Sequence, residues 1–172
     1  MNAFRSEAEL TQLALESRGL FEPIANDGLL LWRRQEPKGL FGVPDLVVAC
    51  STERTVFHPS LRICAFEFKL RNWTRALIQA YKYSSFAHYS FVVMDECFVH
   101  RAIQHMREFE RSNIGLISIS KRGDVIWHFH PEPRLPYSPQ LHRKLESQIW
   151  WDSVFCEQQF VFRVSESTRL QP

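Results

Sequence analysis

The spacing of apolar and polar residues predicts a protein that mixes helices with strands. Apolar runs of strand length, bounded by turn-forming residues, predict six strands, at residues 28–34, 45–50, 61–70, 89–94, 114–120 and 124–130. Apolar residues at helical spacing predict four helices, at residues 6–18, 72–86, 97–110 and 140–151. The chain therefore begins in the order helix, three strands, helix, strand.

The first helix carries recognisable end signals. Ser6 precedes it and Glu9 follows three residues later, which is the spacing of a capping box. Leu10, Leu13 and Ala14 form one apolar face, and Ser17 has the spacing to extend it. Gly19 is typical of a helix C-terminus, so we expect the helix to stop there.

The length of the chain suits a single domain. With 172 residues, it can bury a sizeable core. We expect residues 1–164 to form one domain, with a core over about 6–130 and a C-terminal helical extension over about 131–164. Residues 165–172 are expected to be a flexible tail. We find no internal repeat and no low-complexity block.

The composition is that of a globular protein. The chain is 45% hydrophobic and 23% charged, which argues against intrinsic disorder. Its formal net charge is only +2, whereas strong non-specific binders of nucleic acid are usually more basic. Any affinity for phosphate must therefore come from a local patch.

The cysteines and the N-terminus predict a cytoplasmic location. The 4 cysteines are scattered without a CxxC pair or zinc spacing, and Cys50 and Cys64 fall in predicted buried strands. The first residues lack the apolar region of a signal peptide. No apolar run reaches the length of a membrane span, so we expect no membrane partner.

The tripeptide Glu67-Phe68-Lys69 lies in the apolar run of the third strand. On a strand of period two, Glu67 and Lys69 share one face and the aromatic residues fill the other. Charges on a buried strand are costly unless a bound cation, a phosphate or another group compensates them. Asp45 heads the preceding apolar run, so a second carboxylate can lie at the end of a neighbouring strand. This pattern indicates a metal site.

Pro44-Asp45 followed by Glu67-x-Lys69 on consecutive strands resembles the PD-(D/E)XK nuclease superfamily. The resemblance covers roughly residues 6–94. It implies an α/β fold of the restriction-endonuclease-like type, an αβββαβ core with a central mixed sheet flanked by helices, here with a small C-terminal extension. It also implies that Asp45, Glu67 and the Phe68 backbone carbonyl bind Mg²⁺ or Mn²⁺, and that Lys69 positions the attacking water. The alternative is a structural ion pair beside a turn aspartate.

Many members of that superfamily add a glutamate from the first helix. Glu7, Glu9 and Glu16 are the candidates in this chain. Glu7 lies at the edge of the apolar face and can reach the sheet, whereas Glu9 suits the capping box and Glu16 suits a solvated position. We choose Glu7. The alternative is that all three are ordinary surface charges.

The helix after the third strand carries a second motif. Gln79 and Tyr83 resemble the Q-h-x-x-Y motif of exonuclease-type members. The same +4 spacing continues towards the N-terminus to Arg75 and Arg71. Lys82 lies seven residues after Arg75, on the same side of the helix. We expect this line to grip a phosphate backbone, with Arg71, Arg75, Gln79, Lys82 and Tyr83 as its residues. The alternative is a solvated helix face. Trp73 is expected to belong to the core.

Three further features have mainly structural interpretations. His128 and His130 alternate on a strand, which we interpret as a half-exposed face and not a metal site. Trp150 and Trp151 are expected to pack a terminal helix onto the core, and the alternative is a patch that faces a partner. Residues 33–38 include two arginines and a lysine that either contact DNA or belong to a solvated hairpin.

The resemblance implies a Mg²⁺-dependent nuclease that hydrolyses DNA phosphodiester bonds, without a nucleotide cofactor. A homodimer is suggested only by analogy with relatives. The alternative is a catalytically inactive module that keeps the fold and binds DNA or a protein partner. A third alternative is an α/β protein in which the motif arises by chance. The sequence leaves open the DNA structure preferred and the choice between endonuclease and exonuclease.

Overall fold

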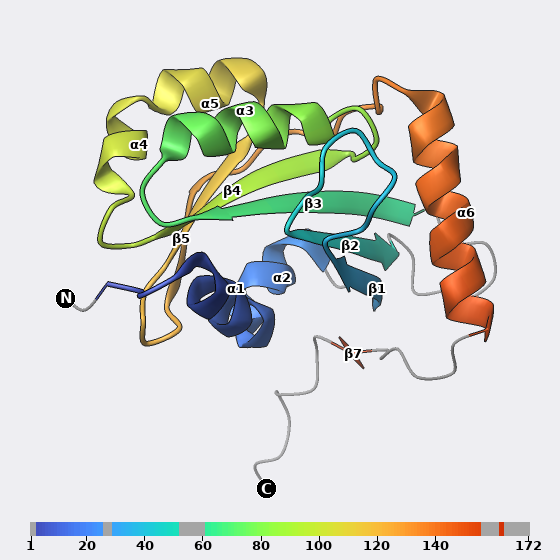
Figure 1. The fold of residues 1–172 in the computed structure, drawn as a ribbon, viewed down its shortest axis with the longest axis horizontal. Helices are drawn as coiled ribbons and strands as arrows, with labels where there is room; N and C mark the ends of the chain where they lie inside the picture. Colours follow the sequence, from blue (N-terminus) through green and yellow to red (C-terminus); the bar gives the residue numbers. More distant parts are fainter. Residues whose placement is uncertain (1–2, 26–28, 52–60, 156–161, 164–172) are drawn as a thin grey trace, which may run out of the picture.

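A mixed β-sheet forms the centre of the molecule (Figure 1). The computed structural model describes residues 3–25, 29–51, 61–155 and 162–163. The strand order is β6-β5-β4-β3-β2-β1-β7. The strands are β1 (Leu29–Gln35), β2 (Leu46–Ser51), β3 (Leu61–Lys69), β4 (Tyr89–Asp95), β5 (Gly115–Ile119), β6 (Val125–Phe129) and the two-residue β7 (Phe162–Arg163). All six predicted strands are confirmed, and β7 was not predicted.

Helices cover both faces of the sheet, as Figure 1 shows. On one face lie α1 (Glu7–Glu16) and α2 (Arg18–Ala25). On the other lie α3 (Trp73–Tyr83), α4 (His100–Gln104) and α5 (Met106–Ser112). The long α6 (Pro139–Phe155) stands at one end of the sheet, beside β1. The fold is therefore α/β, with a mixed sheet flanked by helices.

The strand directions bring particular chain ends together. β1, β2 and β3 pair antiparallel, whereas β3, β4 and β5 pair parallel through helical crossovers. In the antiparallel pair, Leu46 at the start of β2 lies opposite Phe66 near the end of β3. The residue that precedes β2 therefore lies at the same edge of the sheet as the residues that end β3.

The alternation of side chains on β3 separates two hydrophobic clusters. Phe66 and Phe68 face α1 and α2, and the Phe66 ring stacks on Phe91 of β4 with centroids 5.0 Å apart. Ala65 faces the other way, towards α3. Because the apolar residues on this strand point to both faces, β3 is buried on both sides.

The expected end of the first helix at Gly19 is wrong. α1 ends at Glu16, and Gly19 lies inside α2. Pro23 within α2 has no N–H, so it leaves the carbonyl of Gly19 without its helical donor. The indole nitrogen of Trp127 donates to that carbonyl at 3.0 Å. A contact distant in sequence thus compensates for the proline, and the local pattern does not reveal it.

Two other helix predictions need correction. The single helix expected over residues 97–110 is two helices, α4 and α5, with a break at His105. α6 is longer than residues 140–151, and the extension is not purely helical because β7 pairs with β1. Residues 52–60 and the predicted tail at 165–172 lie outside the described residues.

The described residues test the expectations for the cysteines and for membrane-spanning segments. Cys50 and Cys64 are buried, as predicted, while Cys156 lies outside the described residues. None of the helices in the described part of the chain is both long enough and apolar enough to cross a membrane.

Candidate functional site

Asp45 is held in place by backbone atoms of β3. Its N–H donates to the carbonyl of Phe66 at 3.1 Å, which extends the β2–β3 ladder by one residue. Its carboxylate Oδ2 accepts from the N–H of Phe68 at 2.6 Å. The carboxylate therefore lies directly beside the end of β3, in the position that the sequence predicted.

Glu67 and Lys69 form a buried ion pair at that edge. Glu67 is 1% exposed, and its Oε1 lies 2.9 Å from Lys69 Nζ. This oxygen has no well-aligned hydrogen bond to any described residue, so the contact is chiefly electrostatic. Lys69 Nζ also lies 3.1 Å from Glu7 Oε2 and 3.0 Å from the carbonyl oxygen of Phe68. One ammonium group is thus surrounded by three oxygens.

Tyr83 of α3 contacts the other oxygen of Glu67. Its hydroxyl forms a short hydrogen bond to Glu67 Oε2 and lies 3.1 Å from the carbonyl oxygen of Val43. A phenol has one proton, and an ionised carboxylate is the stronger acceptor. Burial, with the hydrogen bond to Glu67, raises the pKa of Tyr83 well above its usual value, so the phenol stays protonated.

The pKa values of Asp45 and Lys69 are both raised, but for different reasons. Burial raises the pKa of Asp45 to about 6, and the negative charge of Glu67 adds to the shift although the Phe68 N–H opposes it. Burial alone lowers the pKa of Lys69, but Glu67, Glu7 and Asp45 outweigh it, and the net pKa is raised. At neutral pH Lys69 is therefore a charged donor and not a general base.

The oxygen atoms at this edge suit a hard divalent cation in their chemistry. Asp45 and Glu67 supply carboxylates and Phe68 supplies a carbonyl, all of them oxygen ligands of the kind that Mg²⁺ prefers. Among the described residues, no group of three His, Cys, Asp or Glu side chains is arranged to hold a metal. A Mg²⁺ ion in this place would therefore depend on the Phe68 carbonyl and on water, which Mg²⁺ usually retains.

The structure distinguishes the three glutamates of the first helix. Glu7 reaches Lys69 and is half exposed, at 50%. Glu9 accepts from the N–H of Arg5 and pairs with Lys121, while its own N–H donates to Ser6 Oγ. Glu16 accepts from Gln12. Only Glu7 among the three contacts the cluster of Asp45, Glu67 and Lys69.

The predicted phosphate-gripping line on α3 is not a single face. Tyr83 is 1% exposed and bound to Glu67, so its phenol has no surface with which to contact DNA. Arg71 precedes α3 and stacks over the ring of Phe98, with its guanidinium carbon 4.2 Å from the centroid. Arg75 and Lys82 are exposed on the helix. Helical spacing identified the residues but not the face on which each lies.

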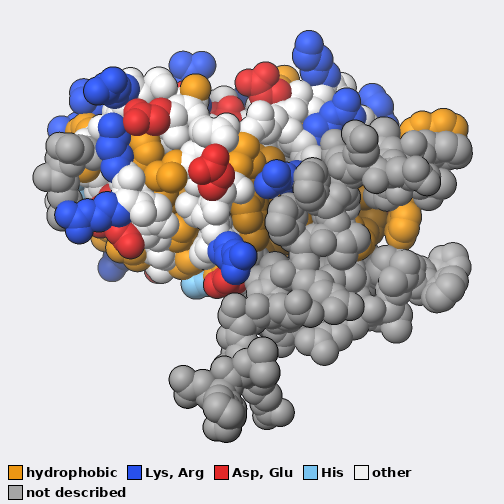
Figure 2. All heavy atoms as spheres, turned by 90° about the horizontal axis from the view of Figure 1, so that it is seen from below, with side chains coloured by type: hydrophobic (Ala, Val, Ile, Leu, Met, Phe, Trp, Pro, Cys, Tyr) orange, Lys and Arg blue, Asp and Glu red, His pale blue; other side chains and the backbone are white. Residues whose placement is uncertain are grey.

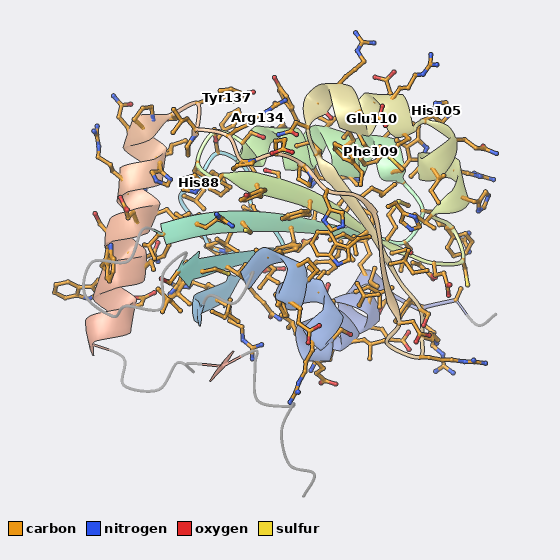
Figure 3. All side chains as sticks on the ribbon, turned by 180° about the vertical axis from the view of Figure 1, so that it is seen from behind. His88, His105, Phe109, Glu110, Arg134 and Tyr137 are labelled. Atoms are coloured by element: carbon orange, nitrogen blue, oxygen red, sulfur yellow. The ribbon has the colours of Figure 1, made fainter. Side chains whose placement is uncertain are left out.

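Gln79 has a feature that the sequence could not predict. Its Oε1 is buried and has no hydrogen-bond partner among the residues that the structure describes. A buried amide oxygen without a donor is costly, so a donor from solvent or a ligand would stabilise this side chain. Trp73, in contrast, is partly buried against the core as expected, and its ring stacks on His105 with centroids 4.8 Å apart. His105 lies at the break between α4 and α5 (Figure 3).

His128 and His130 do not share a face. The pairing of β5 with β6 shifts between Leu116 and Ile117, which places His128 in an irregularity of the strand. His128 bonds to Ser118 Oγ, whereas the His130 ring stacks on Trp127 with centroids 4.6 Å apart. The shared face predicted from strand alternation is therefore wrong.

Asp95 is a buried carboxylate that the sequence reasoning missed. It is 1% exposed at the end of β4, and it accepts from the N–H groups of Phe4 and Cys97 at 2.9 and 2.8 Å. It thereby fastens the segment before α1 to the sheet and so positions Glu7. The signal was present, because an acidic residue ends the apolar run that forms β4.

The surface charges are mixed in sign. Figure 2 views the molecule from the side of α1 and α2, and its described part shows cations and anions interspersed with apolar atoms. Arg34 pairs with Asp152 of α6 at 3.3 Å, and Arg33 donates to the carbonyl of Leu15. Lys38 is exposed. Both arginines thus have contacts within the protein.

Trp150 and Trp151 are exposed, contrary to the packing expected of them.

Comparisons with protein-family models, with curated proteins and with solved structures gave no match.

Proposed function

We propose that this protein is a metal-dependent nuclease that hydrolyses DNA phosphodiester bonds. The observation that carries the proposal is the convergence of Asp45, Glu67, Lys69 and Glu7 at one edge of the sheet. A part-buried carboxyl group with a raised pKa, as at Asp45, is more frequent at functional sites than elsewhere. The resemblance to the PD-(D/E)XK superfamily supplies the class of reaction.

The order of elements supports the same proposal. Apart from the additional α2, the chain runs α1, β1, β2, β3, α3, β4, which is the αβββαβ order of the restriction-endonuclease-like fold. Asp45 precedes β2, and Glu67 and Lys69 end β3, as in the motif of that superfamily. We therefore assign the finer fold class as part of this proposal.

Asp45, Glu67 and the carbonyl of Phe68 would hold Mg²⁺ or Mn²⁺. The metal, when bound, lowers the pKa of water and offsets negative charge on the phosphate. Tyr83 and the Phe68 N–H each hold one carboxylate oxygen, so both carboxylates are oriented before substrate arrives. Lys69 then orients the attacking water through its N–H groups and stabilises charge that develops on the phosphate.

The role of α3 in binding DNA is narrower than the sequence suggested. Arg75 and Lys82 are exposed and can contact phosphate oxygens without losing a partner inside the protein. Tyr83 positions Glu67 instead. Gln79 and Arg71 remain candidates for strand contact from the same side of the sheet.

The test is cleavage of labelled single-stranded, duplex and branched DNA with Mg²⁺ or Mn²⁺. Asp45→Ala and Lys69→Ala are expected to lower the cleavage rate by about 10²- to 10³-fold, as loss of a charge-stabilising group does. Lys121→Ala, which removes a half-buried lysine that pairs with Glu9, is the matched control and should retain the rate. Cleavage that survives both substitutions at the site would refute the proposal.

The second candidate is an inactive module of the same fold that binds DNA or a protein partner. It is favoured by the observation that groups of the protein already compensate the charged side chains. Lys69 contacts Glu67 and Glu7, and the Asp45 carboxylate accepts from the N–H of Phe68. This candidate predicts DNA or protein binding without cleavage on any of the substrates. It also predicts that Mg²⁺ leaves the melting temperature unchanged, because no binding term is added to the folded state.

A further inference from the structure

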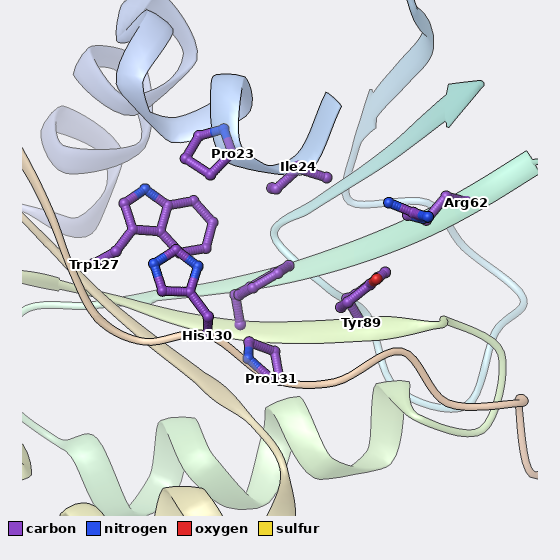
Figure 4. Close-up of a pocket in the computed structure, with 8 residues that line it drawn as sticks. Pro23, Ile24, Arg62, Tyr89, Trp127, His130 and Pro131 are labelled. Atoms are coloured by element: carbon purple, nitrogen blue, oxygen red, sulfur yellow. The ribbon is translucent and has the colours of Figure 1, made fainter. Parts of the chain in front are cut away.

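A cavity lies on the opposite face of the sheet from α3. It is a cavity of about 240 Å³ beneath α2, at the end of the sheet where β3 and β4 begin. Its lining comes from α2, β3, β4, β6 and the segment after β6 (Figure 4). None of the residues of the proposed nuclease centre contributes to it.

The lining combines aromatic rings with one cation. Tyr89 and Phe91 stack on each other along β4, with centroids 6.1 Å apart. Trp127 meets Phe91 edge to face at an interplanar angle of 84°, and His130 stacks on Trp127. The cavity is therefore bordered by rings in two nearly perpendicular orientations. Phe91 is itself buried and supports the others, so the ring surface open to the cavity comes from Tyr89, Trp127 and His130. Accessible ring surface suits a flat aromatic group, which can stack on it.

Arg62 supplies the cation at the other end of the cavity, away from Trp127 and His130 (Figure 4). Its guanidinium carbon lies 5.6 Å from the centroid of the Tyr89 ring. In the described parts of the chain, no carboxylate lies within ion-pair distance of Arg62. A planar guanidinium beside an aromatic ring is well suited to phosphate, because it offers paired N–H donors.

The backbone fixes the aromatic lining. Gly115 of β5 pairs with Phe91, and a Cβ atom at position 115 would lie 2.3 Å from Phe91 Cδ1. The Phe91 ring occupies its place only because that residue is glycine. The Trp127 indole is held by its hydrogen bond to Gly19. The rings therefore do not depend on a ligand for their arrangement.

We propose that this cavity binds a nucleoside 5′-phosphate, with the base against Trp127 and His130 and the phosphate at Arg62. The nucleotide is either free or the terminal residue of a DNA strand, since both present the same base and phosphate. The cavity is smaller than the roughly 300–1,000 Å³ of pockets that enclose larger ligands, so it takes one ring system and leaves the sugar towards solvent. Base stacking on aromatic side chains tolerates different bases, and we expect little preference among them.

The experiment is isothermal titration calorimetry of the full chain with adenosine and uridine 5′-monophosphates. Each nucleotide should bind, and adenosine and ribose 5-phosphate should each bind about tenfold more weakly, because each lacks one half of the contacts. Arg62→Gln should weaken nucleotide binding by about tenfold while leaving adenosine binding unchanged. His130→Ala, at an exposed position, should weaken both nucleotides.

Two variants serve as controls of charge. Arg101→Gln removes an exposed arginine from α4 on the other face and should bind as the wild type does. Glu132→Gln removes a negative charge that acts on Tyr89 and should tighten binding by about twofold. Circular dichroism of each variant checks that it folds, so a loss of binding is assigned to the cavity.

A tetranucleotide with a 5′-phosphate distinguishes the two sources. Tighter binding of this strand than of the mononucleotides, lost in Arg62→Gln, identifies a strand end. Equal or weaker binding identifies a free nucleotide. Asp45→Ala should bind mononucleotides normally, so failure of the nuclease proposal does not affect this one. Absence of mononucleotide binding up to about 10 mM, or binding that is unchanged in both Arg62→Gln and His130→Ala, would overturn the proposal.

Discussion

Strand β3 carries two sites of opposite character at its two ends. Near its start, Arg62 faces the α2 side and borders an aromatic cavity. Near its end, Glu67 and Lys69 face the α3 side and form a packed cluster with Glu7 and Asp45. The two sites face opposite sides because their residues are separated by odd steps along a strand of period two.

The difference lies in how each charge is compensated. The cluster of Asp45, Glu67 and Lys69 neutralises itself with protein groups, so its charges contribute to the stability of the fold as well as to any chemistry. Arg62 contacts a ring and an open cavity instead. Substitutions at the first site should therefore change stability strongly, and substitutions at the second should mainly change binding.

The largest expected effect comes from breaking the buried ion pair. Lys69→Met leaves the Glu67 carboxylate buried without its cation, and we expect the free energy of unfolding to fall by about 3–5 kcal/mol. Urea denaturation measures this change. Lys82→Met, which removes an exposed lysine on α3, is the control and should change stability by at most about 0.5 kcal/mol. A loss below about 1 kcal/mol in Lys69→Met would mean that water reaches the pair and screens it.

The next effect tests the rigidity of the aromatic cavity. Gly115→Ala forces a methyl group against the Phe91 ring, so we expect a loss of about 1–3 kcal/mol in stability and weaker nucleotide binding. Gly19→Ala is the matched control, because its new Cβ would meet Val125 Cβ at an ordinary 3.4 Å and it lies in a helix. That variant should be unchanged or stabilised by about 0.5–1 kcal/mol. Equal destabilisation of both variants would contradict a specific clash at Phe91.

A smaller effect depends on pH and tests whether the cluster is strained by its own charge. The folded protein holds a proton on Asp45 up to about pH 6, whereas an ordinary aspartate releases it near 3.8. Because the folded state binds this proton more tightly than the unfolded state, the protonated Asp45 stabilises the fold at low pH. That stabilisation is lost as the pH rises from about 3.8 to about 6. Full conversion of the shift gives about 3 kcal/mol, and partial contact with water reduces this to about 1–2 kcal/mol.

Asp45→Asn removes the free-energy cost of ionising a part-buried carboxyl group at position 45. The amide of Asn keeps an oxygen that can accept from the Phe68 N–H. The variant should be more stable than the wild type by about 1–2 kcal/mol at pH 8 and equal to it at pH 3.5, as measured by thermal denaturation. The affinity of the protein for Mg²⁺ should rise with pH up to about pH 6, because the metal-free carboxyl group must lose its proton before it can act as a ligand. A stability difference that does not vary with pH would show that the Asp45 charge is not the cause.

The smallest effect provides an exposed ion pair for comparison with the buried one. Arg34→Gln breaks the pair with Asp152, whose side chains are 48% and 25% exposed. We expect a loss of at most about 1 kcal/mol, and less at high salt, because solvent already screens these charges. The measurement is urea denaturation at two salt concentrations. A loss as large as that of Lys69→Met would remove the distinction between the two kinds of pair.

The sequence by itself determined the strands and the proximity of Asp45 to Glu67 and Lys69 at one edge of the sheet. Strand periodicity is a local property, so the six predicted strands were found within a few residues of their observed bounds. Two residues at the start of one strand and the end of its antiparallel neighbour must lie at one edge of a sheet. The choice of Glu7 also follows from its place on the helix face, and the structure brings it to Lys69.

The tertiary structure decided which side of α3 each motif residue occupies. The +4 spacing placed Tyr83 with Arg75 and Gln79, yet packing against the sheet buries Tyr83 against Glu67 and leaves Arg75 exposed. Likewise, Gly19 had the local features of a helix end, but it lies in the first turn of α2, where Trp127 donates to its carbonyl. The aromatic cavity combines α2, β3, β4 and β6, which no sequence window contains. Local patterns set the elements, and long-range packing sets which of their faces meet, because burial is a property of the assembled chain.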